Sequence, residues 1–417
     1  MRNFTLTTLV SLITIYAVFS QETSVLFLGN SYTNTQNLPA TLYNLALEGG
    51  DTLIYDSNTP GGYTLNGHST NATSLSKIAS RDWDFVVLQE QSQMPSFGDA
   101  QVAAEVFPYA EILVDSIRSN YECSEPVFFM TWGRRDGDQS NCAGFPALCT
   151  YEGMQERLRN AYLQMTFDND VTVGPCGAAW QQMALNNTQF FTGLYANDGS
   201  HPSAWGTYLN ACVFYATILK KSPVGIEYYS TIGETDAVVL QQLAEDVVLD
   251  SLSTWNIGHA DVNSEAAYDY YSAFIVEFSS NSDNATSHLW DFGDGQTSSL
   301  ENPVHTYSTD NLFEVTHIAY SACGTDTTIL EVGSNPLAIE TSAVNKLTIV
   351  SNNGTHVITN PTSVNFQLEV LDVTGRITYH AALKGNSNLV IDQPNIAGIK
   401  LIRISNDSET RTFKVYD

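Results

Sequence analysis

The sequence predicts an α/β domain with a mostly parallel sheet, followed by two small all-β modules. From Ser24 onward, short apolar runs alternate with amphipathic stretches, as in sheets whose strands are joined by helices. Past Asn256 the helical periodicity disappears, and short alternating strands with Gly, Asn, Asp and Ser turns continue to the C-terminus. The length of 417 residues also exceeds the roughly 250–300 residues at which a single hydrophobic core stops growing.

Five apolar runs are the expected strands of the first domain. They are residues 25–28 (VLFL), 52–55 (TLIY), 85–88 (FVVL), 127–130 (VFFM) and 171–173 (VTV). Helical spacing predicts helices over residues 103–117, 154–165 and 238–252, and a further helix beginning near Trp205. In such sheets ligands bind at the carboxyl ends of the strands, so we expect functional residues there.

Residues 1–20 have the features of a signal peptide. Arg2 supplies an early positive charge, an apolar run extends to Phe19, and Ser20 is a small residue at a plausible cleavage point. The run is too short to span a bilayer stably. We therefore expect a secreted or cell-surface protein, with no membrane span in the mature chain.

Charge and cysteine content narrow the possible partners. The formal net charge of −28 repels nucleic acid and anionic membrane surfaces, which excludes nucleic acid as an expected partner. Export permits disulfides, and Cys142 and Cys149, which bracket a short loop, form the best-supported pair among the six cysteines. Neither C-x-x-C nor H-E-x-x-H occurs, so we expect no metal and no cofactor.

Ser31 is the candidate nucleophile. It follows the first predicted strand in the triplet Gly29–Asn30–Ser31, and a helical pattern comes after it. At a strand-to-helix turn its hydroxyl would be exposed at the sheet edge, near the positive end of a helix. By itself the triplet is more typical of a helix cap.

Asp198 and His201 are the candidate partners of Ser31. They lie three residues apart in the segment DGSHP (198–202), just before a predicted helix. At this spacing the carboxylate can accept from one imidazole nitrogen and leave the other free to take the serine proton. A turn followed by a helix cap is the alternative interpretation of this segment.

With this pair of motifs, residues 22–258 resemble the SGNH (GDSL-like) hydrolase family. The resemblance implies a flavodoxin-like sheet and hydrolysis of ester bonds, with Ser31 as nucleophile, His201 as base and Asp198 as its acidic partner. This chain has Asn30 where the family usually has Asp. The absence of G-x-S-x-G argues against the α/β-hydrolase type of serine esterase.

The resemblance also implies an oxyanion hole. One donor is the backbone N–H of Ser31, and a second is a glycine N–H after the second strand, where Gly62 is preferred over Gly61. The third is usually an Asn side chain, which is missing from residues 88–93 (LQEQSQ). Gln93 falls at its position, and Gln91 is the competing candidate.

Trp132 and Arg134, after the fourth strand, are candidate substrate-binding residues. Aromatic faces stack on sugars, and a guanidinium binds carboxylates. An internal network of Arg and Asp in this loop is an equally good interpretation, and Trp180 is expected to be a core residue.

Residues 262–333 resemble a PKD domain, an immunoglobulin-like sandwich. The segments LWDFGDG (289–295) and NPVHTY (302–307) carry the resemblance. Trp290 and Phe292 are expected in its core, and Asp291 and Asp294 are expected to cap turns rather than to bind calcium.

Residues 340–417 resemble the C-terminal sorting domain of the type IX secretion system. LDVTGR (371–376), AGIKLI (397–402) and TFKV (412–415) carry this resemblance, which implies secretion machinery as a partner. An adhesive β-sandwich is the alternative.

Taken together, these motifs predict a secreted serine esterase that removes acyl groups, with O-acetyl groups on a saccharide as the expected substrate. The alternative is a non-catalytic surface adhesin or saccharide-binding protein on a hydrolase scaffold, motivated by the altered third motif.

Overall fold

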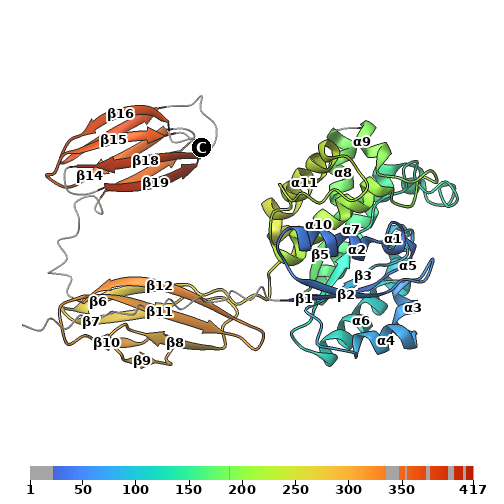
Figure 1. Ribbon diagram of the computed structural model, residues 1–417, viewed down its shortest axis with the longest axis horizontal. Helices are drawn as coiled ribbons and strands as arrows, with labels where there is room; N and C mark the ends of the chain where they lie inside the picture. The colour runs from blue at the N-terminus through green and yellow to red at the C-terminus, as the bar shows by residue number, and fades with distance from the viewer. Residues whose placement is uncertain are drawn as a thin grey trace, which may run out of the picture. The chain divides into compact units, whose positions relative to one another are not determined.

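The computed structural model describes residues 22–334 except residue 187, and residues 347–416 except 353–354, 372–375, 393–398 and 407–409. Contacts divide the chain into two units, Met1–Ala260 and Asp261–Asp417 (Figure 1). No helix in the described ranges is long and apolar enough to cross a membrane. The predicted signal peptide lies outside the described residues.

The first unit is built on a five-stranded parallel sheet, as predicted. Its strand order is β2-β1-β3-β4-β5. The strands are β1 (Thr23–Leu28), β2 (Leu53–Asn58), β3 (Phe85–Leu88), β4 (Glu125–Phe129) and β5 (Thr172–Gly174). This is the flavodoxin-like order, in which β2 lies on one side of β1 and β3, β4 and β5 follow in turn on the other side. The carboxyl ends of β1 and β3 therefore lie side by side.

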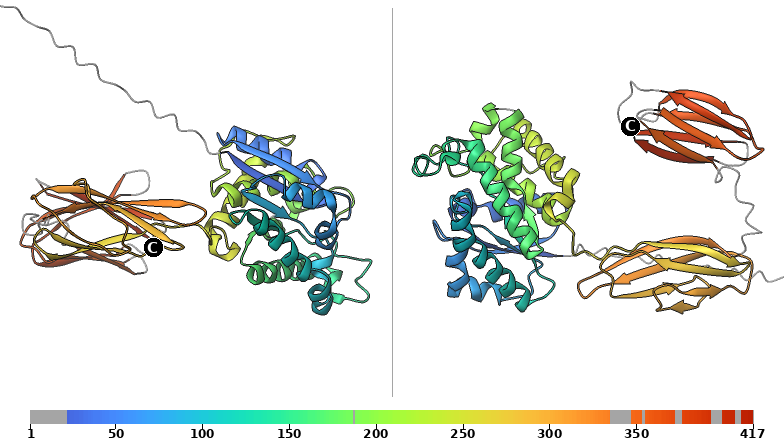
Figure 2. Two further views of the ribbon diagram at one scale, coloured as in Figure 1. Left: turned by 90° about the horizontal axis from the view of Figure 1, so that it is seen from below. Right: turned by 180° about the vertical axis from the view of Figure 1, so that it is seen from behind.

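Helices cover both faces of this sheet (Figures 1 and 2). On one face lie α3 (Leu65–Thr70), α4 (Ala72–Ile78) and α6 (Phe107–Asn120). On the other lie α2 (Leu38–Glu48), α8 (Cys176–Asn186), α10 (Ala204–Leu219) and α11 (Glu234–Val248). The first unit also contains α1 (Ser31–Asn34), α5 (Asp99–Glu105), α7 (Tyr151–Asn169) and α9 (Thr188–Gly193), and the 3-10 turns η1 (Met94–Ser96), η2 (Pro146–Cys149) and η3 (Leu249–Trp255).

One predicted helix is divided in two. The pattern over residues 103–117 predicts a single helix, but α5 ends at Glu105 and α6 begins at Phe107. Val106 between them has φ −121° and ψ −61°. Pro108 lacks the N–H that would continue the helical ladder, and proline is tolerated only in the first turn of a helix. The helix therefore restarts at Phe107, with Pro108 in its first turn.

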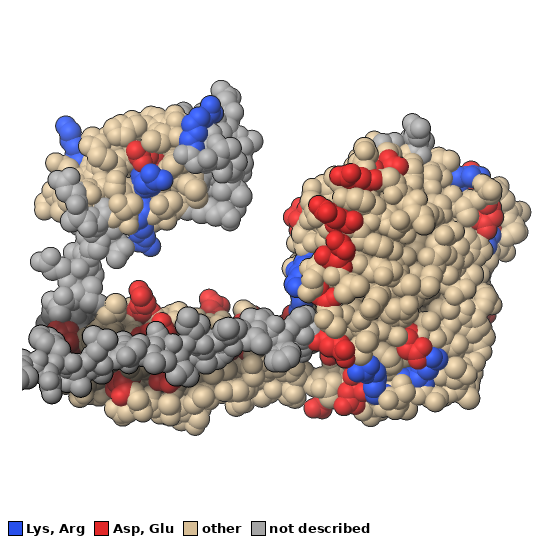
Figure 3. All heavy atoms as spheres, in the orientation of Figure 1, with Lys and Arg blue, Asp and Glu red and all other residues tan. Residues whose placement is uncertain are grey.

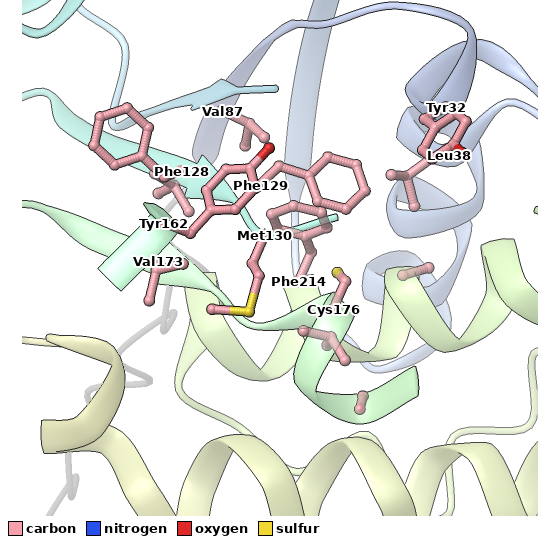
Figure 4. Close-up of a cluster of buried hydrophobic side chains, with 14 of the residues drawn as sticks. Tyr32, Leu38, Val87, Phe128, Phe129, Met130, Tyr162, Val173, Cys176 and Phe214 are labelled. Atoms are coloured by element: carbon pink, nitrogen blue, oxygen red, sulfur yellow. The ribbon is translucent and has the colours of Figure 1, made fainter. Parts of the chain in front are cut away.

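Apolar side chains from strands and helices form the core of the first unit (Figure 4). Phe129 of β4 packs edge-on against Phe214 of α10, with ring centroids 4.9 Å apart. Cys176 and Cys212 are buried thiols. Cys142 and Cys149 form a disulfide, which confirms the predicted pair.

The second unit begins with two antiparallel sheets, ordered β10-β7-β6 and β12-β11-β8-β9. Their strands are β6 (Ala266–Ser272), β7 (Ile275–Ser280), β8 (Ser287–Asp291), β9 (Thr297–Ser298), β10 (Val304–Thr306), β11 (Leu312–Tyr320) and β12 (Thr325–Gly333). Trp290 and Phe292 are buried in the cluster between them, as predicted. Asp291 accepts a bond from Gly293 N and Asp294 accepts one from Gln296 N, so both carboxylates cap turns.

Two further antiparallel sheets follow, ordered β13-β14-β17 and β16-β15-β18-β19. Their strands are β13 (Thr348–Asn352), β14 (Thr355–Asn360), β15 (Phe366–Leu371), β16 (Ile377–Leu383), β17 (Ser387–Asp392), β18 (Ile399–Ser405) and β19 (Thr410–Tyr416). This module has its own buried cluster, which includes Leu368, Ile402 and Ile404. Residues 372–375 and 397–398 of the sorting-domain motifs lie outside the described residues.

Acidic residues exceed basic ones across the chain, 45 to 17. On the face of the first unit drawn in Figure 3, most of the surface is uncharged, and Asp and Glu side chains lie mainly towards one side with a few Lys and Arg among them. The excess of acidic residues over the whole chain favours solubility.

Candidate active site

Ser31 lies at the start of α1, three residues beyond the end of β1. The sequence pattern suggests a longer helix after Ser31, but α1 is a single turn. Gln36 and Asn37 adopt left-handed φ values of 58° and 55°, and α2 then begins at Leu38. Ser31 thus lies at the N-terminus of a helix, as the sequence predicts, although this helix is a single turn.

Buried polar bonds fix the turn that carries Ser31. Gln89, at the end of β3, accepts from Asn30 N at 3.0 Å and from the Thr33 hydroxyl at 2.8 Å. A Cβ on Gly29 would lie 2.5 Å from Thr33 Oγ1 and 2.8 Å from Gln89 Oε1. Glycine is therefore needed at position 29 for this close approach of β1 and β3.

Asp198 and His201 form a compact loop after α9. One carboxylate oxygen of Asp198 accepts from the backbone N–H groups of Ser200 and His201, each at 3.0 Å. The other lies 2.6 Å from His201 Nδ1. Gly199 has φ +66°, a left-handed conformation that favours glycine in this tight turn.

The loop brings His201 to the nucleophile turn, 170 residues away in the sequence. His201 Nε2 lies 2.9 Å from Ser31 Oγ. The sequence-predicted residues Ser31, His201 and Asp198 are thus joined by a continuous line of hydrogen bonds. With Nδ1 donating to Asp198, Nε2 is left as the acceptor of the serine proton.

The surroundings of Asp198 favour its ionised form. Partial burial alone would raise the pKa of Asp198, but hydrogen bonds from the His201 side chain and from two backbone N–H groups lower it below its usual value. The side chains of His201 and Asp198 are 34% and 50% exposed, so the pair is accessible from solvent.

The loop that carries Gly62 is tied to the nucleophile turn. Asn30 Nδ2 donates to the carbonyl oxygen of Tyr63 at 2.8 Å, while Asn30 Oδ1 accepts from Tyr32 N at 3.0 Å. Gly62 itself has φ +69°. The structure thus holds the residue after Gly62 against the residue before Ser31, and the role of Gly62 as an N–H donor stays a prediction.

Gln91 and Gln93 bond to each other and to a buried carboxylate. Gln93 Nε2 donates to Asp138 at 2.6 Å, and Gln91 Nε2 donates to Gln93 Oε1 at 3.2 Å. Gln91 Oε1 in turn accepts from the Gln93 backbone N–H at 2.8 Å. These bonds give both amides internal partners, and the identity of a third oxyanion donor stays a prediction.

Trp132 is not available to a sugar, so its predicted role in substrate binding is wrong. Its side chain is completely buried between two other rings. The Tyr32 ring stacks on it at 4.8 Å and the Trp180 ring at 4.0 Å, both nearly parallel. The buried Trp180 confirms the expectation of a core residue.

Arg134 belongs to the internal network that was the alternative interpretation of its loop. Its guanidinium lies 3.0 Å from Asp138, a carboxylate with no exposed surface. Burial acts to raise the pKa of Asp138, but bonds from Ser140, Asn141 and Gln93 and the charge of Arg134 lower it overall. The ion pair with Asp138 places Arg134 in this internal network, while Arg134 Nε is buried without a hydrogen-bond partner among the described residues.

Two buried ionisable residues beside the site were not singled out as functional from the sequence. His68 is fully buried, with Nε2 2.9 Å from Gly29 O and Nδ1 2.7 Å from Ser74 Oγ. Burial raises the pKa of Glu90 to about 8, and bonds from Gln91 N and Leu65 N act in the opposite direction. The available signal for Glu90 was its position as the second residue after a buried strand.

Comparisons with known proteins identify one domain and several similar folds. A PKD domain model matches residues 259–332. The search of curated proteins finds no match. Over its N-terminal half, the chain is similar to solved structures that include SGNH hydrolases.

Three such structures illustrate the range. A DUF4886 family protein from Bacteroides uniformis is 17% identical, with 55% of this chain and 95% of that chain covered and a TM-score of 0.47. A predicted SGNH hydrolase from Slackia heliotrinireducens is 25% identical, with coverage of 48% and 100% and a TM-score of 0.39. An acetyl xylan esterase from Geobacillus stearothermophilus is 14% identical, with coverage of 49% and 96% and a TM-score of 0.36. The match to the family model shows that residues 259–332 form a PKD domain.

Proposed function

We propose that the first unit is a serine esterase in which Ser31 attacks the ester, His201 is the general base and Asp198 orients His201. The observation that carries this proposal is the line of hydrogen bonds from Ser31 Oγ to His201 Nε2 at 2.9 Å and from His201 Nδ1 to Asp198 at 2.6 Å. A helix cap requires neither contact, because capping uses backbone N–H groups.

The reaction proceeds through an acyl-enzyme. His201 takes the proton of Ser31 as Ser31 Oγ bonds to the carbonyl carbon of the ester. The protonated imidazole then gives that proton to the departing alcohol. In the second half, His201 takes a proton from water as the water oxygen bonds to the acyl carbon. His201 then returns that proton to the Ser31 oxygen, and the carboxylic acid is released. Backbone N–H groups of Ser31 and Gly62 are the proposed donors to the oxyanion.

The accessibility of the site is compatible with a large alcohol. With His201 and Asp198 one-third and one-half exposed, a bulky alcohol can extend into solvent while its acyl group reaches Ser31. An acetyl group on a saccharide fits this description, and we propose acetylated saccharides as the substrate class. Because Trp132 is buried, it gives no support to a saccharide substrate. The proposal of a saccharide rests on the accessibility of His201 and Asp198.

We further propose that the protein is exported, through residues 1–20 and the sorting-like residues 340–417. Deletion of residues 340–417 in a host that carries a type IX system is expected to retain the protein inside the cell. Release of the truncated protein at the full-length rate would contradict this assignment.

Hydrolysis of p-nitrophenyl acetate tests the esterase. Ser31→Ala and His201→Ala are each expected to lower kcat/KM by about 10³-fold or more, since the residual rate of triad variants comes only from binding and the oxyanion hole. Ser69→Ala is the matched control, because its exposed hydroxyl bonds only to its own helix at Asn66 O. Equal activity in Ser31→Ala would contradict Ser31 as the nucleophile. No ester hydrolysis by the wild-type protein would contradict the esterase and favour a binding protein on a hydrolase scaffold.

A further inference from the structure

Ser200, between the two proposed catalytic residues of the acid–base loop, is held at two of its oxygens. Its hydroxyl lies 2.6 Å from the Tyr32 hydroxyl. Its carbonyl oxygen accepts a 3.0 Å bond from Trp132 Nε1. The loop is therefore hydrogen-bonded to Tyr32 of the nucleophile turn and to Trp132, which follows β4.

These bonds restrict the backbone directly before His201. The peptide that joins Ser200 to His201 contains the carbonyl held by Trp132 and the N–H that donates to Asp198. Because both ends of this peptide group are bonded, it cannot rotate without breaking one of them. Rotation would carry the imidazole away from Ser31.

The groups that hold Ser200 are themselves rigid. Tyr32, Trp132 and Trp180 form a continuous stack with interplanar angles of 9° and 4°. Tyr32 is 3% exposed and Trp132 is fully buried. The outer ring of the stack also meets the imidazole, since the Tyr32 and His201 ring centroids lie 5.3 Å apart in an edge-on arrangement.

Adjacent residues on the two segments are thus paired twice. Ser31 contacts His201, and Tyr32, the next residue, contacts Ser200, the residue before His201. The ring of contacts closes through two peptide bonds. Displacement of either segment would break both pairs together.

We propose that Tyr32, through Ser200, is a positioning residue that keeps His201 within reach of Ser31, with Trp132 holding the same loop from the other side. The inference rests on the proposed esterase function. Neither aromatic residue can touch the substrate, because both are buried. Their effect is therefore on the rate of proton transfer and not on substrate binding.

The test compares Tyr32→Phe, Ser200→Ala and the double variant in the full-length protein. Tyr32→Phe keeps the stack and removes only the hydroxyl, and Ser200→Ala alters a partly exposed loop residue that leaves the core intact. Tyr208→Phe is the matched control, since its buried hydroxyl donates to Tyr228 O and accepts from Gln241, on elements distant in sequence from the loop.

The quantities to be compared are kcat and KM for p-nitrophenyl acetate and the rate at which a fluorophosphonate labels Ser31. Each single variant is expected to lower kcat and the labelling rate by about 10-fold to 100-fold, the cost of a misplaced catalytic group, with KM changed less than about twofold. Both substitutions break the Tyr32–Ser200 contact, and Tyr32→Phe also removes the contact of the Tyr32 hydroxyl with Ser92. The double variant is therefore expected to lose no more activity than Tyr32→Phe alone. Tyr208→Phe is expected to retain the wild-type rates.

Wild-type kcat in both single variants, or losses that multiply in the double variant, would overturn the inference. Either result leaves the esterase proposal intact as long as the wild-type protein is labelled at Ser31. If wild-type protein is not labelled, the proposed function fails, and the positioning role fails with it.

Discussion

Asn30 Nδ2 donates a 2.8 Å hydrogen bond to the carbonyl oxygen of Tyr63. This bond links the nucleophile turn to the loop that carries Gly62, and it requires an amide. An aspartate at position 30 could still accept from Tyr32 N but could not donate to Tyr63. The departure from the usual G-D-S triplet therefore has a structural reason in this chain.

Asn30→Asp is expected to lower kcat/KM for p-nitrophenyl acetate by about 10-fold to 100-fold. The variant loses a buried hydrogen bond and brings a carboxylate towards a carbonyl oxygen, close to where the oxyanion forms. Asn30→Ala, which loses the bond without adding charge, is the control and is expected to fall less. If Asn30→Asp were as active as the wild type, the link to the Gly62 loop would be irrelevant to catalysis.

Asp198→Asn is expected to lower kcat by about 10²-fold to 10⁴-fold, because an amide does not favour the imidazole tautomer and charge that the mechanism needs. The same substitution has a pH signature in stability. The folded-state pKa of Asp198 is depressed, so its contribution to the free energy of unfolding is present above the ordinary pKa of an aspartate and is lost as pH falls through the folded value.

Thermal unfolding tests the predicted pH dependence of the contribution of Asp198 to stability. The difference in Tm between wild type and Asp198→Asn is expected to be largest at neutral pH and to shrink below about pH 4. Because the side chain is half exposed, the difference is expected to be small. A difference that grows on acidification would contradict the assignment of Asp198 as an ionised acceptor.

Glu90→Gln is expected to change stability with the opposite pH dependence. The pKa of Glu90 is raised from 4.5 to about 8 by burial, so between these values the folded protein holds a proton that the unfolded chain has released. The free energy of unfolding of the wild type therefore decreases as pH rises through this window, and the glutamine variant lacks this decrease.

Unfolding temperatures measured from pH 5 to pH 8 give the test. The Tm of Glu90→Gln relative to wild type is expected to rise steadily over this range. Glu105→Gln, a substitution at an exposed position of α5, controls for the change in total charge. A constant offset between Glu90→Gln and wild type would mean that Glu90 is already ionised in the folded protein.

Trp290→Ala is expected to destabilise the PKD domain without loss of ester hydrolysis. Trp290 is fully buried against Phe278 and His317 in a hydrophobic cluster separate from the core of the first unit. Truncation of a buried Trp costs about 3–5 kcal/mol. Calorimetry is expected to show one transition at lower temperature with kcat/KM unchanged, and a parallel loss of activity would show that the two units depend on each other.

The features that could be predicted from the sequence are those set by local patterns. Buried strands appear as apolar runs, and the ends of each predicted strand lie within three residues of the observed ones. The spacing of Asp198 and His201 is equally local, because a carboxylate and an imidazole three residues apart on a tight turn can meet without help from the rest of the fold. Their approach to Ser31 follows once both segments are placed at one sheet edge.

Features that depend on several distant segments could not be predicted. Trp132 follows a strand end like a ligand-binding residue, but Tyr32 and Trp180 close over its two faces, and no pattern near position 132 indicates this. The single turn of α1 was missed for another reason. Gln36 and Asn37 adopt left-handed conformations, which asparagine tolerates, and these conformations interrupt the helix. The apolar spacing from Leu38 onward is helical and gives no indication of this interruption.

Covalent labelling by a fluorophosphonate tests the central claim most directly, because the reagent reacts only with a serine whose proton is removed by a positioned base. Intact-mass analysis and peptide mapping of the folded wild-type protein are expected to show one adduct, located on Ser31. His201→Ala, folded to the same extent, is expected to show none. An unlabelled Ser31 in the folded wild-type protein, or equal labelling in the His201→Ala variant, would contradict the account.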